Sequence, residues 1–209
     1  MSDSKSRPVL CTECSQPMES PICCAGCGAL NPLPPSLFTY FELFGLEPTY
    51  EIDLGELRRK YLTLSRSIHP DVAGRTSDSQ RAQSLALSSG LNRAYETLRN
   101  PVDRAEYLLH LANGPSAADD KSVPGELLGE VMMLREQIEE ATEANDQDLL
   151  ASTRAEVLKQ QKETLEEIAS ICRSGDLKEP ATQQRLRQQL NAVKYWNNLL
   201  EKIPLQVES

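Results

Sequence analysis

The chain has 209 residues, which is enough for one or two small domains with a buried core. Its net charge of -9 argues against a general nucleic-acid-binding protein, because such proteins are normally basic. No stretch approaches the roughly 20 apolar residues of a membrane span, so we expect neither nucleic acid nor a membrane as a partner.

The first eight residues, MSDSKSRP, have no apolar core like that of a secretion signal. They are also too short and too mixed in charge for an amphipathic transit sequence. We therefore expect a bacterial cytoplasmic protein, with a processed protein of the mitochondrial matrix as the alternative.

The composition favours helices, and the placement of the cysteines favours a reducing compartment. Aromatic residues make up 5% of the chain, while Leu, Ala, Gln, Glu and Arg are abundant, which predicts an all-α fold. Five of the six cysteines lie between Cys11 and Cys27, as a local cluster rather than a disulfide framework. The sixth, Cys172, is expected to be a small core residue of a helix.

Four cysteines form a C-x2-C…C-x2-C pattern: Cys11, Cys14, Cys24 and Cys27. Each pair places two thiolates on one tight turn, and two such turns complete a tetrahedral shell that suits Zn2+. We predict a structural zinc knuckle in residues 1–36, because a closed shell leaves no open position for chemistry. Cys23 is the spare thiol, since only Cys24 has the right spacing to Cys27. A redox or disulfide pair is the alternative.

A stiff linker at 31–36, NPLPPS, precedes a short helix expected at 40–46 and ended by Gly45. Asp53 is a good N-cap for a second helix. The inward positions of this second helix recur at helical spacing: Leu54, Leu57, Tyr61, Leu64 and Ile68. Its other face carries four cations: Arg58, Arg59, Lys60 and Arg66. They indicate either a solvated face or a binding surface for an acidic partner.

The sequence His69-Pro70-Asp71 follows the basic helix. Pro70 lacks an amide proton and disfavours helical geometry at His69, so the helix should end near Ile68. An imidazole and a carboxylate are then held on an exposed turn. A catalytic base at His69 is disfavoured, because no serine, cysteine or second histidine is placed to complete a site. His110 is expected to be structural.

A polar loop at 73–79 leads to a third helix, which ends at 100–101 and is followed by a shorter helix at 102–112. The second and third helices are expected to form an antiparallel pair, with the His69 turn at one end. The inward positions of the third helix are Leu87, Leu91, Ala94, Tyr95 and Leu98, with Leu85 near that face.

Residues 114–123 are a linker by composition, and helices are expected at 125–144, 146–174 and 181–203. Their short connections predict an antiparallel three-helix bundle. The inward face of the first helix is Leu127, Val131, Leu134 and Ile138. This leaves Leu128, Met132 and Met133 near a second face, and Tyr195 and Trp196 cannot both point inward. These residues are either an exposed docking patch for a client protein or further core.

Several of these features together resemble a J-domain: the basic helix, His-Pro-Asp, and the segment 91–98, LNRAYETL. The segments 40–46, YFELFGL, and 100–109, NPVDRAEYLL, are similar to the HscB family, the J-domain co-chaperones of iron–sulfur cluster assembly. The four-cysteine knuckle resembles the longer members of that family. The resemblance covers essentially the whole chain, is strongest at 40–109, and is mainly architectural beyond Gly125.

The resemblance implies a non-enzymatic co-chaperone with a J-domain at 37–113 and a scaffold-binding bundle at 124–209, joined by the linker at 114–123. The J-domain would dock on a DnaK/HscA-type chaperone and stimulate its ATP hydrolysis through Arg58, Arg59, Lys60, Arg66, His69, Pro70 and Asp71. The bundle would hold an IscU-type scaffold through Leu128, Met132, Met133, Glu136 and Tyr195. The match departs where Met133 and Gly129 replace the more usual acidic and apolar choices.

Two alternatives stay open. One is a J-domain protein for another client, in which the cysteine segment acts as a redox or substrate-binding finger. The other is a metal-dependent enzyme, which is disfavoured because four thiolates saturate zinc. The oligomeric state and the identity of the chaperone paralogue are not determined by the sequence.

Overall fold

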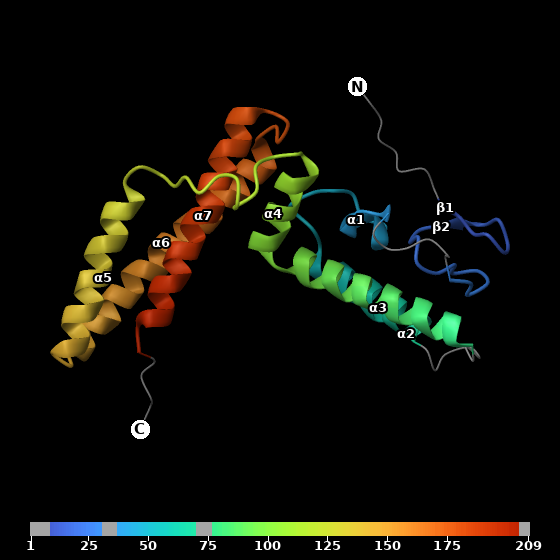
Figure 1. Ribbon diagram of the computed structural model, residues 1–209, viewed down its shortest axis with the longest axis horizontal. Helices are drawn as coiled ribbons and strands as arrows, with labels where there is room; N and C mark the ends of the chain where they lie inside the picture. The colour runs from blue at the N-terminus through green and yellow to red at the C-terminus, as the bar shows by residue number, and fades with distance from the viewer. Residues whose placement is uncertain (1–8, 31–36, 70–76, 205–209) are drawn as a thin grey trace. The chain divides into compact units, whose positions relative to one another are not determined.

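The computed structural model describes residues 9–30, 37–69 and 77–204 of the chain (Figure 1). Apart from two short strands the elements are helices, so the predicted helical fold is confirmed. In chain order they are β1 (Val9–Leu10), β2 (Pro17–Met18), α1 (Tyr40–Leu43), α2 (Leu54–Ile68), α3 (Asp78–Arg99), α4 (Pro101–Leu111), α5 (Leu127–Glu143), α6 (Gln147–Ser174) and α7 (Pro180–Lys202). Among the described helices, none is both long and apolar enough to cross a membrane.

The chain divides into two compact units, residues 1–104 and 105–209, which we call unit 1 and unit 2. The boundary falls inside α4. The domain limits expected from the sequence depend on linker composition and motifs, and they stay a prediction.

Unit 1 is built around α2 and α3, which lie side by side (Figure 1). Leu57 and Ile68 of α2 are buried, as is most of the predicted inward face of α3. Two expectations are wrong: Leu54 is 52% exposed and Leu85 is 64% exposed. Leu54 is the first residue of α2, beside its exposed cap, and Leu85 lies about 200° around the helix from the buried Leu87.

Side-chain capping and the turn at His69 define the ends of α2. The Asp53 carboxylate accepts hydrogen bonds from the backbone N–H groups of Gly55, at 2.8 Å, and Glu56, at 3.1 Å. These bonds lower the pKa of Asp53 because they favour the charged form, and the bond from Glu56 has the largest effect. At the other end His69 leaves helical geometry with φ −58° and ψ 134°, as expected for a residue before proline.

The carbonyl groups at the end of α1 are held from two sides. The Ser20 hydroxyl, from the cysteine segment, donates to the Leu43 carbonyl at 2.6 Å. The Lys60 ammonium, from α2, donates to the carbonyls of Phe44, at 3.0 Å, and Gly45, at 3.2 Å. Gly45 has φ +58°, and a Cβ placed on it would lie 2.4 Å from the Glu19 carbonyl oxygen. Only glycine fits this position without a backbone shift.

Unit 2 is the predicted three-helix bundle of α5, α6 and α7 (Figure 1). On α5 the predicted inward residues Leu127, Leu134 and Ile138 are buried, and Val131 is half-buried against them. On α7 Trp196 is buried and its indole N–H donates to the Thr164 hydroxyl at 2.9 Å. Its neighbour Tyr195 is only half-buried, so the two side chains are not both in the core, as predicted.

Three polar residues of α7, spaced four apart, bind α4 and the segment between α4 and α5. Gln183 donates to the Ala112 carbonyl at 2.9 Å. Arg187 is fully buried and donates to both carboxylate oxygens of Glu106, with an Nη2–Oε2 distance of 2.7 Å. Asn191 donates to the carbonyls of Asp120, at 3.0 Å, and Ser122, at 2.9 Å. The part of this connection within unit 2 is therefore fixed to the bundle.

Replacing Glu106 by alanine is expected to destabilise unit 2 by about 3 kcal/mol, because it leaves the buried Arg187 guanidinium without its counter-charge. Urea denaturation followed by the fluorescence of Trp196, the one tryptophan of the chain, measures this loss. Glu201→Ala, at an exposed position of α7, is the control and should change stability by less than about 0.5 kcal/mol. Equal effects of the two substitutions would contradict the assignment.

Candidate functional site

The two C-x2-C segments fold into matching loops. The N–H of Ser15 donates to the Cys11 carbonyl and the N–H of Gly28 donates to the Cys24 carbonyl, both at 2.9 Å. The fifth residue of each loop has positive φ, 57° at Ser15 and 74° at Gly28. Glycine takes this conformation at no steric cost, which explains why a glycine, Gly28, follows the second pair. Each loop thereby turns its two thiols to the same side.

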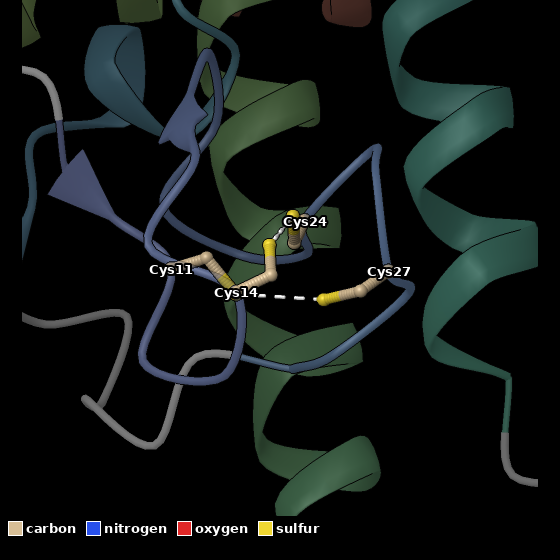
Figure 2. Close-up of side chains that lie close together, drawn as sticks. All are labelled: Cys11, Cys14, Cys24 and Cys27. Atoms are coloured by element: carbon tan, nitrogen blue, oxygen red, sulfur yellow. Dashed lines mark hydrogen bonds between the residues drawn. The ribbon is translucent and has the colours of Figure 1, made fainter.

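The four thiols converge on one point (Figure 2). All their sulfur atoms lie within 4.8 Å of one another, with distances of 3.5 Å from Cys11 to Cys27 and 3.6 Å from Cys14 to Cys24. Tetrahedral coordination at a Zn–S distance of about 2.3 Å requires sulfurs about 3.8 Å apart. A disulfide requires about 2.05 Å, and none forms between the described cysteines. The arrangement is compatible with a bound metal ion, and its sulfur–sulfur distances are longer than that of a disulfide.

The pKa values of Cys24 and Cys27 depart from that of an ordinary thiol in opposite directions. The backbone N–H of Cys27 and other donors lower the pKa of Cys24 to about 7, against the effect of burial. At Cys27 the Ala29 N–H favours the thiolate, but the neighbouring Cys11 sulfur and burial outweigh it and raise the pKa to about 12. One thiol thus ionises easily and another resists ionisation beside it. A bound metal cation would offset this repulsion between thiolates.

Residues around the four thiols complete the knuckle. Cys11, Cys24 and Met18 form a small buried cluster against which Ala29 packs. Cys23 lies outside the set of four, with its sulfur 3.5 Å from the Gly28 carbonyl, which agrees with its prediction as the spare thiol. Met18 could not be singled out from the sequence, since the spacing of ligands carries no signal for the residues packed behind them.

The exposed face of α2 is cationic. Arg58, Arg59 and Arg66 are exposed, and His69 is exposed directly after the helix. Lys60 differs from the three arginines: it binds the end of α1 and pairs with Glu56 at 3.1 Å. The two remaining predicted chaperone contacts, Pro70 and Asp71, lie outside the described residues.

The second predicted surface lies on α5. Leu128 is 49% exposed, Met132 is 63% exposed and Met133 is 61% exposed, so these side chains are not core. Leu128, Met132 and the exposed Glu136 are four residues apart and form one stripe on the helix. A Cβ placed on Gly129, beside this stripe, meets nothing within 4 Å. Tyr195 lies on α7 and packs partly against the bundle core.

Comparison with known proteins identifies the family. The chain is 33% identical over 138 residues to a protein of Ralstonia nicotianae named "Co-chaperone protein HscB homolog", and the match covers 66% of this chain and 78% of that protein. The chain belongs to the HscB family of co-chaperones. A mouse HscB protein, "Iron-sulfur cluster co-chaperone protein HscB", is 31% identical over 185 residues, which cover 87% of this chain and 74% of the mouse protein.

Solved structures and a domain profile agree with the HscB assignment. The crystal structure of human co-chaperone HscB aligns with a TM-score of 0.73 and 27% identity, over 93% of this chain and 96% of the human one. The chaperone HscB from Vibrio cholerae aligns with a TM-score of 0.66 and 27% identity, over 79% of this chain and 95% of that chain. The profile described as "HSCB C-terminal oligomerisation domain" matches residues 123–204, which hold the bundle. The resemblance to the HscB family is thus confirmed, and the zinc-binding long form stays a prediction.

The four-thiol site is expected to bind one thiophilic metal ion per chain. Titration with Co2+, whose thiolate complexes absorb strongly, measures both stoichiometry and affinity. Cys14→Ser should weaken binding strongly because it removes one of four ligands, and acidification should weaken it because the ligands are thiolates. Cys23→Ser is the matched control and should bind like the wild type. Equal loss in both variants would contradict the assignment of ligands.

Proposed function

We propose that this HscB-family protein is a non-enzymatic adaptor. Unit 1 recruits a DnaK/HscA-type chaperone and stimulates its ATPase, and unit 2 presents an IscU-type iron–sulfur cluster scaffold. The observation that carries the proposal is the exposed arginine face of α2, which leads directly to His69 in a chain of net charge -9. The mouse relative, named as an iron–sulfur cluster co-chaperone, supports the choice of pathway.

Chaperone docking is mainly electrostatic in this proposal. Arg58, Arg59 and Arg66 are exposed, so their charges can act on an acidic partner surface, and the Arg59 charge also lowers the pKa of Asp53. Such charges accelerate association and make it sensitive to salt. The His69 imidazole donates or accepts a hydrogen bond at the same junction, and Asp71 accepts one from a partner arginine. The Lys60 ammonium contributes mainly through its support of α1.

Scaffold docking is mainly apolar. Leu128, Met132 and Met133 expose flexible apolar side chains, which fit irregular partner surfaces, and Glu136 adds a charge at the end of the stripe. Tyr195 contributes its half-buried ring from α7. The resemblance of these positions to the scaffold contact of HscB proteins supports this role.

Zinc is the metal that we propose for the knuckle, held by Cys11, Cys14, Cys24 and Cys27. When bound it supplies structural crosslinking of the two loops, since four thiolates leave no open position. The cellular location stays a prediction: the relatives come from bacteria, mouse and Arabidopsis, and the bacterial cytoplasm is our choice.

The chaperone role is tested by the steady-state ATPase of the host's DnaK/HscA-type chaperone. The wild-type chain should stimulate turnover, and His69→Gln should abolish the stimulation because it removes the group at the tip of the docking face. The matched control is His110→Gln, at an exposed histidine of α4, which should stimulate like the wild type. No stimulation by the wild type, or equal stimulation by His69→Gln, would refute the role.

The scaffold role is tested by calorimetric titration of an IscU-type protein. Leu128→Ala and Met132→Ala should each weaken binding about tenfold, because each removes an exposed apolar side chain from the stripe. Leu158→Ala is the control, since Leu158 is 42% exposed on α6. If the scaffold does not bind, or if all three variants bind equally, the alternative of a different client is favoured.

A further inference from the structure

An exposed leucine lies among the arginines of α2. Leu62 is 41% exposed. Arg58, Leu62 and Arg66 are four residues apart and form one stripe along the helix. Arg59, three residues before Leu62, and the exposed Thr63 flank the stripe. An apolar side chain thus stands between cations on the face that points away from the core.

Leu62 is not one of the buried core residues of unit 1. The buried side of α2 is formed by Leu57 and Ile68, which are at most 1% exposed. Leu62 lies about 140° around the helix from Leu57 and about 120° from Ile68. A helix face that only contacts solvent, or that binds its partner only through charge, is expected to carry a polar or charged residue at position 62. Single exposed leucines are common on proteins, but this one stands in the middle of a docking face.

We propose that Leu62 is the apolar anchor of the chaperone docking face, and that the partner surface has an apolar recess bordered by carboxylates. This inference rests on the proposed function of α2 as the chaperone-binding helix. The arginines form a polar rim that steers encounter, while the leucine side chain is desolvated in the complex and slows dissociation. Chaperones with an acidic but featureless surface would then be poor partners, so Leu62 determines specificity.

Leu62→Lys tests the inference because the two kinds of partner surface predict opposite changes in binding affinity. A purely acidic surface would bind the variant more tightly, since a further cation joins the face. A surface with an apolar recess would bind it more weakly, by about tenfold in the chain concentration that gives half-maximal ATPase stimulation. Lysine and leucine have similar helix propensities, so α2 should persist, and circular dichroism checks this. Leu62→Ala should weaken binding in the same direction and leave the salt dependence unchanged.

The control is Leu85→Lys, which adds the same charge at a leucine of α3 that is 64% exposed. It should stimulate with the wild-type half-maximal concentration. Tighter or unchanged binding by Leu62→Lys, while His69→Gln remains inactive, would overturn the role of Leu62 and leave the proposed function intact. Failure of the wild-type chain to stimulate any DnaK/HscA-type chaperone would instead overturn the proposed function itself.

Discussion

The end of α1 is the constraint on which unit 1 depends. A helix leaves its last carbonyl groups without internal partners, and burying them without donors is costly. Here the donors come from both neighbours in the chain, Ser20 of the knuckle and Lys60 of α2. Gly45 allows the knuckle backbone to approach, because any side chain would meet Glu19. The cysteine knuckle is therefore attached to α1, and α1 in turn to α2.

The two proposed surfaces differ in physical character, as two different partners require. The surface on α2 is an arginine rim around Leu62, whereas that on α5 is a stripe of leucine and methionine. Each lies on the outward face of a helix whose opposite face packs in a core, so neither needs a conformational change to be reached. In unit 2 the bond from the buried Arg187 to the partly exposed Glu106 fixes this part of α4 to the bundle. Rigid supports of this kind reduce the entropy lost on binding.

Sequence periodicity predicted most of the fold, because local patterns determine where helices begin and end. The Asp53 cap, the proline after His69 and the C-x2-C spacing each act within a few residues. Long-range polar contacts carry no such signal. The burial of Arg187 depends on Glu106, which is 81 residues away, and an arginine in an amphipathic helix is normally expected to be exposed. The sequence likewise places Lys60 among the cations of the exposed face. It does not reveal that the Lys60 ammonium binds the end of α1.

In the proposed adaptor, one chain joins two partners. ATPase turnover of the chaperone, measured with and without the scaffold, tests it through complementation. Wild-type chain should give a larger rate with scaffold than without it, because docking delivers the scaffold to the activated chaperone. An equimolar mixture of the His69→Gln chain and a Leu128→Ala, Met132→Ala chain carries both intact surfaces on separate molecules. We predict that this mixture gives no scaffold-dependent increase; an increase equal to that of the wild type would contradict the adaptor.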